Sequence, residues 1–285
     1  MSYRFTPGGI VASTDAPVVS FVTVSYRMLH FIRHLLTGIQ EAAPGFTFEF
    51  FLVDNASNDQ TVEWVRERFP WVRVIASKEN IGLSAANNLA LKEATGEFIM
   101  HLNPDLTIFS GELDKWVDWM KQRPEVGISG PRLLNPDGTD QDSCYRFHRL
   151  MTPVYRRTPL GRTPWGKRHT DNFLMKDMNR EQEQDVDWVL GAAMLMRRDL
   201  VSKIGNFDDR FFLYFEDTDI CRRAWRAGSR VTYTPVTKIL HYYRRESRTK
   251  HVWDVFRNKI TRVHIKSAIK YFWKYKGEKH PRATR

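Results

Sequence analysis

The sequence predicts an α/β fold in which helices cover both faces of one large, mostly parallel sheet. Two observations carry this prediction: apolar runs of strand length alternate with helix-like stretches, and two of those runs end next to an acidic residue. Alternating strands and helices are typical of a doubly wound, Rossmann-like sheet. Such sheets bind ligands beyond the carboxyl ends of their strands, so the two acids indicate the ligand side.

The expected elements follow one another in a regular order. Strands rich in Val, Ile and Phe, as buried strands are, are expected at 18–24, 48–53, 72–75 and 97–102. Helices are expected between them at 29–41, 61–69 and 83–94. Further along, we expect ordered segments at 186–191 and 193–196, a helix at 220–227 and a late strand at 230–233.

Charge and composition divide the 285 residues into segments. The net charge is +11, and residues 244–285 hold 14 Lys/Arg against 3 Asp/Glu, which leaves 30 of each sign in residues 1–243. We expect a flexible leader at 1–16, one α/β domain at 17–243 and a basic helical tail at 244–285. Within the domain, 143–170 holds seven Lys/Arg and no acid, together with several Pro and Gly, and is expected to be a mobile basic loop.

The tail has the pattern of a basic amphipathic helix. Apolar residues between 252 and 273 recur at roughly helical spacing, with Lys and Arg between them. This pattern predicts contact with an anionic membrane surface, with Trp253, Phe256, Phe272 and Trp273 at the interface. The alternative is a helix that packs on the body. The excess of basic residues leaves a non-enzymatic nucleic-acid-binding protein as an alternative function, but because the body is neutral we expect no nucleic-acid partner.

The location of the protein is inferred from three further features. No apolar run approaches the length of a membrane-spanning helix, and the first residues lack the layout of a signal peptide. Cys144 and Cys221 are too few for a disulfide framework and are expected to be free thiols. We therefore expect a cytoplasmic protein that associates peripherally with the inner face of the cell membrane.

Acidic and amide side chains follow the strand at 48–53. Asp54 and Asn55 come directly after it, where a carboxylate can accept hydrogen bonds from a nucleotide base or ribose. The alternative is helix capping, because Ser57, Asn58 and Asp59 are good N-cap residues.

The tripeptide Asn103-Pro104-Asp105 follows the strand at 97–102. A carboxylate there could hold a divalent cation that stabilises a nucleoside diphosphate as it leaves. The alternative is a simple turn. The same tripeptide recurs within Asn135-Pro136-Asp137-Gly138, which we interpret as only a turn, because the position after a buried strand favours the first tripeptide as the site.

Three acids follow five apolar residues in Glu216-Asp217-Thr218-Asp219. Burial and mutual repulsion raise the pKa of clustered carboxyls, so one of them could take a proton near neutral pH. The alternative is that they cap the helix expected at 220–227. His241 follows an apolar run, and a lone His is more often a packed residue than a metal ligand.

Taken together, these features resemble family 2 glycosyltransferases with the GT-A fold, most closely a bacterial rhamnosyltransferase-like branch. The resemblance covers about residues 18–245. Six ordered blocks carry it: VDNASNDQT (53–61), ENIGLSAANNLAL (79–91), LNPDL (102–106), VGISGPRLLNPDG (126–138), VDWVLGAAMLMRR (186–198) and GNFDDRFFLYFEDTDICRRAWRAG (205–228).

The resemblance implies a role for each candidate. Asp54 would contact the nucleotide base, with Asn55 beside it. Asp105 would bind the metal, with Asn103 at the first place of the family's Asp-x-Asp motif, and His241 would be the second protein ligand. Asp217 would be the catalytic base, with Glu216 and Asp219 less favoured. The remaining implied contacts are Asn80, Gly82 and Asn87 near the donor and Trp188, Gly191 and Ala192 on the acceptor side.

The resemblance also implies the reaction. A base deprotonates an acceptor hydroxyl, which attacks the sugar in line and inverts its anomeric centre, with Mg²⁺ or Mn²⁺ as cofactor. The implied donor is dTDP-rhamnose, with UDP-sugars open, and the acceptor is a glycan or a polyprenyl-linked saccharide of cell-surface polysaccharide synthesis. A nucleotidyltransferase is an alternative, but 18–27 lacks its Gly-rich phosphate loop. The oligomeric state cannot be inferred from the sequence.

Overall fold

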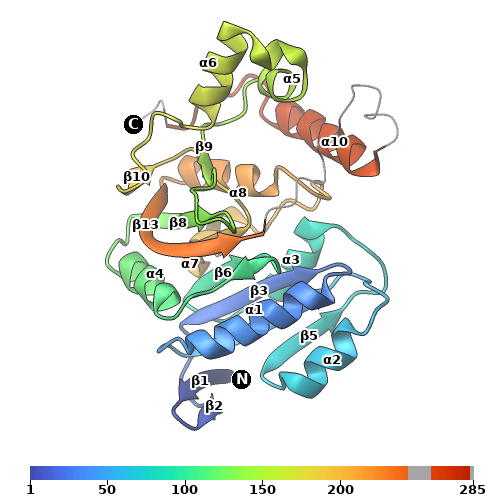
Figure 1. Cartoon of the computed structure of the whole chain (residues 1–285), viewed down its shortest axis with the longest axis vertical. Coiled ribbons are helices and arrows are strands. Elements are labelled where there is room, and N and C mark those ends of the chain that lie inside the picture. Colours follow the sequence, from blue (N-terminus) through green and yellow to red (C-terminus); the bar gives the residue numbers. More distant parts are fainter. Residues whose placement is uncertain (243–257, 283–285) are drawn as a thin grey trace.

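A computed structural model describes residues 1–242 and 258–282. Within these residues, one mixed sheet of eleven strands forms the centre of the molecule (Figure 1). Its strands are β1 (Ser2–Thr6), β2 (Gly9–Ser13), β3 (Val19–Ser25), β4 (Phe48–Asp54), β5 (Val72–Ala76), β6 (Phe98–Leu102), β7 (Leu106–Thr107), β8 (Val126–Leu134), β10 (Gln184–Asp185), β12 (Ala193–Arg197) and β13 (Arg230–His241). A second small sheet pairs β9 (Cys144–Tyr145) with β11 (Trp188–Val189).

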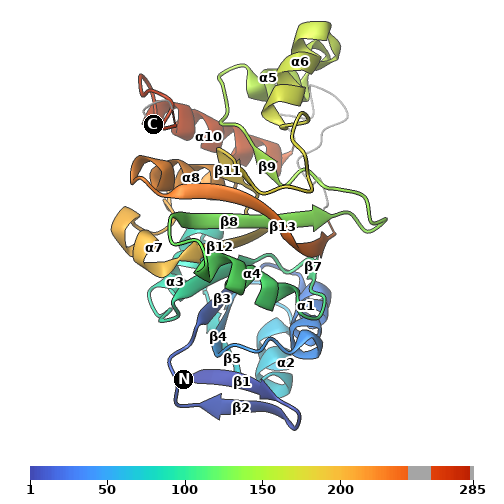
Figure 2. The ribbon, with the colours of Figure 1, turned by 90° about the vertical axis from the view of Figure 1, so that its left-hand side faces the viewer.

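The helices surround this sheet. They are α1 (Leu29–Ala42), α2 (Thr61–Arg68), α3 (Leu83–Leu91), α4 (Glu112–Lys121), α5 (Thr152–Arg157), the 3₁₀ helix η1 (Pro159–Arg162), α6 (Pro164–Phe173), α7 (Arg198–Ile204), α8 (Glu216–Arg226) and α10 (Lys259–Lys274). The strand order is β10-β13-β8-β12-β6-β3-β4-β1-β2, with β5 beside β4 and β7 beside β13. Figure 2 shows helices on both sides of the sheet.

The predicted α/β architecture is confirmed. Strands β4, β3 and β6 run parallel, and β8 and β13 run parallel to each other, while β12 lies antiparallel between β6 and β8. Successive strand residues point to opposite faces. Phe21 and Phe50 pack in the core that α1, α2 and α4 complete, whereas Val22 and Phe51 pack in the core formed with α3, α7 and α8.

Strand β13 is much longer than the late strand expected at 230–233. It runs for twelve residues alongside β8, with a register shift between Thr234 and Lys238 where Pro235 interrupts the ladder. This length carries His241 to the carboxyl edge of the sheet.

The expectation of a flexible leader is wrong. Residues 2–13 form a hairpin in which β1 pairs with β2 and meets β4 through Tyr3 and Phe48. Phe5 stacks on Phe48 with ring centroids 5.1 Å apart. Burial of these alternating aromatic side chains orders the segment.

The expectation of a mobile basic loop at 143–170 is also wrong, because this segment contains β9, α5, η1 and α6. Pro153, Pro159 and Pro164 stand at the starts of the three helices, where proline is favoured. Thr163 caps α6 by accepting a hydrogen bond from Gly166 N at 3.2 Å.

The tail helix packs on the body. Of the helix expected at 252–273, residues 252–257 lie outside the described part of the chain, and α10 begins at Lys259. Ala268, Tyr271 and Tyr275 are buried against Phe211 and Phe215. Among the described residues, no helix is long and apolar enough to cross a membrane.

Candidate active site

The predicted site residues gather at the carboxyl edge of the sheet. Asp54 ends β4, Asn103 and Asp105 follow β6, and His241 ends β13. Strand β12 runs opposite to β6, so its beginning lies at the same edge, where Asn103 N donates to Ala192 O at 2.8 Å. The topology therefore brings together residues that are far apart in the sequence.

One carboxylate oxygen of Asp54 accepts a hydrogen bond from the protein, and the other accepts none within the described residues. Its side chain is buried, Oδ2 accepts from Ser57 N at 3.1 Å, and Oδ1 has no hydrogen-bond partner within the described residues. The helix-capping alternative does not apply to Asp54, because the backbone N–H of Thr61 at the start of α2 donates to Asp59 instead. Because an unpaired buried carboxylate oxygen is unfavourable, Asp54 Oδ1 is an acceptor suited to a ligand donor such as a base N–H or a ribose hydroxyl.

Asn55, Asn80 and Gly82 shape the neighbouring loop. Asn55 Nδ2 donates to Asn80 Oδ1 at 3.1 Å, and Asn80 Oδ1 also accepts from Gly82 N at 3.1 Å. Gly82 has φ +86°, and an added Cβ would lie 2.6 Å from Phe212 O. The two amides thus hold the loop in place, and Gly82 permits its close contact with the segment before α8. Asn87 is buried nearby with Oδ1 unpartnered among the described residues.

Asp105 and His241 face each other, with Oδ1 and Nε2 separated by 3.4 Å. A chain of amides determines which imidazole nitrogen carries the proton. Asn135 Nδ2 donates to Asp140 O, which can only accept, so Asn135 Oδ1 accepts from Gln141 Nε2 at 3.0 Å. Gln141 Oε1 consequently faces His241 Nδ1 at 2.6 Å, so Nδ1 carries a proton and donates it to Gln141 Oε1.

This arrangement suits a divalent cation. In a neutral imidazole with its proton on Nδ1, the lone pair of Nε2 faces the Asp105 carboxylate, and these two groups could then act together as ligands of a cation. No group of three or more His, Cys, Asp or Glu that could hold a metal occurs in the described residues. A site with two protein ligands fits Mg²⁺ or Mn²⁺, whose remaining ligands come from phosphate oxygens and water.

The three acids belong to the first turn of α8 rather than preceding a helix at 220–227, because α8 begins at Glu216. Asp217 is buried, its Oδ2 accepts from Gly191 N at 3.0 Å and its Oδ1 from Thr218 N at 2.7 Å. Burial raises the pKa of Asp217, while these hydrogen bonds oppose the rise. Asp217 is thus a carboxylate held in one orientation with a pKa moved toward neutrality.

The other two acids have different environments. Burial, and then the charge of Asp217, raise the pKa of Glu216 well above its ordinary value, and its Oε2 has no hydrogen-bond partner in the described residues. Asp219 is fully buried and ion-paired with Arg223 and Lys274. Asp217 is therefore the best base of the three, because Glu216 favours its protonated form and Asp219 is already paired.

The turn before α8 has an unusual backbone. Tyr214 and Phe215 adopt φ +68° and +72°, a left-handed conformation that is rare for bulky residues. Such conformations concentrate at functional sites and persist only where surrounding contacts hold them.

Trp188 lies in β11, stacked on Tyr145 with ring centroids 4.2 Å apart, and its Nε1 donates to Arg146 O at 3.0 Å. The structure thus places Trp188 in a buried aromatic layer beside the Gly191 turn. Its acceptor-side role stays a prediction, as do those of Gly191 and Ala192.

Sequence reasoning missed two residues of this edge. Gln141 orients His241, and no local pattern marks it. His101 is buried on β6; burial lowers its pKa to about 4, and contacts with the Asn103 side chain and the Gly191 backbone oppose this shift. A histidine inside an apolar strand could have been recognised as unusual.

The sequence and the fold place this chain among the glycosyltransferases with the GT-A fold. A profile of the family described as "Glycosyl transferase family 2" matches residues 20–205. The chain is 31% identical over 243 residues to the N-acetylglucosaminyl-diphospho-decaprenol L-rhamnosyltransferase of Mycobacterium tuberculosis, covering 79% of this chain and 76% of the relative. It is 36% identical over 198 residues to the rhamnosyltransferase WbbL of Escherichia coli, and this match covers 67% of this chain and 69% of the relative. The chain belongs to glycosyl transferase family 2.

Solved structures share the fold. GalNAc-T7 with UDP, GalNAc and Mn²⁺ superposes with a TM-score of 0.64 at 16% identity over 94% of this chain, which spans 50% of that chain. The mannosyltransferase PcManGT from Pyrobaculum calidifontis, with GDP-Man and Mn²⁺, superposes with a TM-score of 0.56 at 21% identity. The match covers 90% of this chain and 65% of that chain. The predicted family and fold are confirmed, and the nucleotidyltransferase alternative is not supported.

Proposed function

We propose that this protein is an inverting, metal-dependent glycosyltransferase that moves L-rhamnose from dTDP-rhamnose to a polyprenyl-linked saccharide. One observation carries the proposal: Asp217, held by the Gly191 N–H, lies at the same sheet edge as the open oxygen of Asp54 and the Asp105–His241 pair. The names of the two rhamnosyltransferase relatives support rhamnose as the sugar, and the name of the Mycobacterium tuberculosis relative supports a diphospho-polyprenol saccharide as the acceptor. UDP-sugars remain the alternative donors.

In the proposed reaction, Asp54 orients the nucleotide through its base, and Asn87 lies near the donor. Asp217 takes the proton of the acceptor hydroxyl as the hydroxyl oxygen attacks the anomeric carbon and the nucleoside diphosphate leaves. Asp105 and His241 would hold the cation, which when bound supplies positive charge to the diphosphate. One base suffices, because no covalent sugar–enzyme intermediate forms.

Apolar side chains on the outer surface support docking on an anionic membrane. Trp165 of α6 is 63% exposed, and on α10 Ile269 is 62% and Trp273 77% exposed. Exposed basic residues lie close to them in the sequence, including Arg162 three residues before Trp165 and Lys266 three residues before Ile269. Interfacial helices combine these two features, and a protein docked this way reaches a polyprenyl-linked acceptor without spanning the bilayer. Trp253 and Phe256 lie outside the described residues, and Phe272 packs partly on the body.

The proposal is tested with a panel of dTDP- and UDP-sugars, a saccharide linked through diphosphate to a short polyprenol, and Mg²⁺ or Mn²⁺. Transfer from dTDP-rhamnose, with release of dTDP and a product of inverted anomeric configuration by NMR, is expected. Transfer from a UDP-sugar alone would replace the donor assignment. A product of retained configuration would overturn the role of Asp217 as base.

A further inference from the structure

The strained turn before α8 is held by the C-terminal helix. Tyr214 stacks on His264 of α10 with ring centroids 4.4 Å apart and planes inclined by 27°. Ser267 Oγ of α10 donates to Leu213 O at 2.8 Å, and the rings of Phe215 and Tyr271 lie 5.2 Å apart. Each of the three residues before α8 therefore has its own contact with α10.

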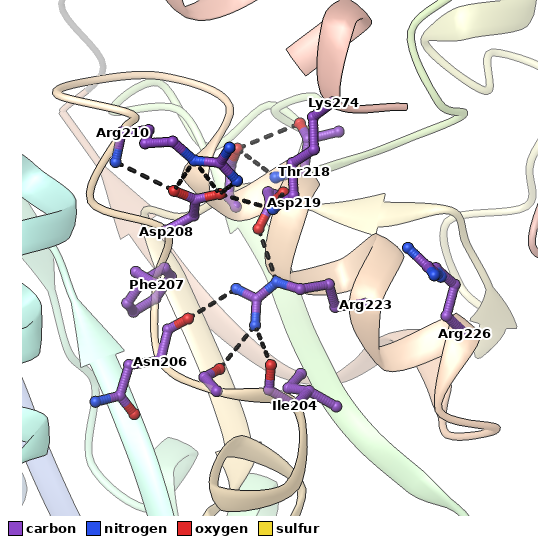
Figure 3. A network of polar contacts seen from close by, with 12 residues as sticks. Ile204, Asn206, Phe207, Asp208, Arg210, Thr218, Asp219, Arg223, Arg226 and Lys274 are labelled. Atoms are coloured by element: carbon purple, nitrogen blue, oxygen red, sulfur yellow. Dashed lines mark hydrogen bonds and ion pairs between the residues drawn. The ribbon is translucent and has the colours of Figure 1, made fainter. Parts of the chain in front are cut away.

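An ion-pair network continues from this turn into the first turn of α8 (Figure 3). Lys274 Nζ of α10 lies between Asp208 Oδ2, at 2.7 Å, and Asp219 Oδ1. Tyr275 OH donates to the same Asp219 oxygen at 2.7 Å, and Arg223 Nε donates to Asp219 Oδ2 at 2.8 Å. Asp219 is fully buried, so this network accounts for both of its oxygens.

The protonation states favour these contacts. Burial raises the pKa of Tyr275, and the charge of Asp219 raises it further, so the hydroxyl stays a donor. Burial alone would raise the pKa of Asp208, but hydrogen bonds from Arg210 and Lys274 hold it well below its ordinary value. Lys274 therefore bridges two carboxylates, one on the loop before the strained turn and one on α8.

The position of Asp217 allows little movement. It lies two residues before Asp219 on the same helical turn, and its Oδ2 accepts from Gly191 N at 3.0 Å. A Cβ added at Gly191 would lie 3.2 Å from Asp217 Cβ, so the backbone of Gly191 already packs tightly against this side chain. A small shift of α8 would break the contact or force a clash.

We infer that α10 is a positioning element of the active site: Lys274 and Tyr275 act through Asp219 to hold the first turn of α8, and so keep Asp217 against Gly191. This inference rests on the proposed role of Asp217 as the base. Lys274 and Tyr275 are positioning residues, because neither belongs to the donor-side edge formed by β4, β6 and β13. Removing their contacts should therefore change turnover and not donor binding.

The test compares Lys274→Met and the milder Tyr275→Phe with the control Arg230→Met. Arg230 also bridges two carboxylates, Glu125 at 2.9 Å and Asp185 at 3.0 Å, but at the start of β13. Each variant is assayed for kcat per folded molecule, donor KM and the acidic limb of the kcat–pH profile. The assay uses detergent micelles, so that membrane docking does not affect the result.

The expected kcat loss is about 10- to 100-fold in Lys274→Met and smaller in Tyr275→Phe, with donor KM unchanged in both. Glu216 and Asp219 lie in the same helical turn as Asp217, and Arg223, Lys274 and Tyr275 pair with Asp219. Removing the ammonium makes these surroundings more negative, so the base holds its proton more tightly. The acidic limb should move to higher pH by about 0.3 to 1 unit in Lys274→Met.

Partial unfolding would lower apparent turnover without moving this limb. The inference is overturned if Lys274→Met matches Arg230→Met in kcat and in limb position. If Lys274→Met does not fold, wild-type kcat in Tyr275→Phe overturns it. If the proposed function itself is wrong, the wild type will transfer no sugar, so this failure can be distinguished from failure of the inference about α10.

Discussion

The orientation of His241 by Gln141 can be tested by replacing Gln141 with Leu. His241 is only 3% exposed, and Gln141 Oε1 accepts its Nδ1–H at 2.6 Å. Without this acceptor, the tautomer with its proton on Nε2, the nitrogen that faces Asp105, becomes more favourable. Cation binding must then displace that proton and restore the Nδ1–H tautomer without its acceptor, so cation binding becomes weaker.

The magnitude follows from the cost of removing the acceptor of a buried hydrogen bond, about 1–3 kcal/mol. Because about 1.4 kcal/mol corresponds to tenfold in affinity, the Mn²⁺ dissociation constant should rise about 5- to 150-fold. Measured effects of residues that orient metal ligands, about 10- to 100-fold, fall in the same range.

The assay is calorimetric titration of Mn²⁺ in the presence of dTDP, with the melting temperature of each variant recorded. The control Gln182→Leu makes the same change at an exposed position and should bind Mn²⁺ as the wild type does. Gln141→Glu, which retains an acceptor for Nδ1–H, should bind more tightly than Gln141→Leu. Wild-type Mn²⁺ affinity in a folded Gln141→Leu variant would refute the reasoning about the tautomer.

Three further predictions follow from the site and the surface. Gly191→Ala places a Cβ 3.3 Å from Asp217 Oδ2 and should lower kcat by about 10- to 100-fold in steady-state assays; unchanged kcat would show that the base tolerates displacement. Burial raises the pKa of Asp217, and a base must be deprotonated, so kcat should fall on acidification with a midpoint above the ordinary Asp value; a midpoint at or below that value would contradict this. Liposomes containing anionic lipid should co-sediment the protein in a salt-sensitive way, and Trp165→Ala with Trp273→Ala should weaken this; salt-independent or absent binding would refute membrane docking.

Local sequence patterns were sufficient for four central strands of the sheet and for the position of two acids at its carboxyl edge. The alternation of apolar strands with helices placed β3, β4, β5 and β6 within a residue or two, and the parallel topology put Asp54 and Asp105 at one edge. These inferences succeed because strand propensity and helical periodicity act over a few residues. The strand expected at 230–233 is shorter than the observed β13. The additional residues of β13 are held by pairing with β8, which lies about a hundred residues earlier in the sequence.

The other expectations that the structure corrects also depend on contacts between residues that are far apart in the sequence. Proline is found both in loops and at helix starts, and only packing shows which applies between 143 and 170. The tripeptides at 103–105 and 135–137 look alike, and the second, which does form a turn, also follows a buried strand, β8, so position after a strand does not separate them. Asn135 of that turn is nevertheless connected to Asp105 of the first tripeptide by contacts through Gln141 and His241. No spacing in the sequence reveals this connection.

The most direct test of the whole account is sugar transfer by Asp217→Asn measured alongside titration of the donor into the same protein. We expect donor affinity close to that of the wild type, with transfer lower by about 10²- to 10⁴-fold, because the amide cannot accept the hydroxyl proton. In parallel, Asp105→Ala should lose both metal binding and transfer. Full transfer by folded Asp217→Asn would contradict the assignment of the base, and with it the proposed mechanism.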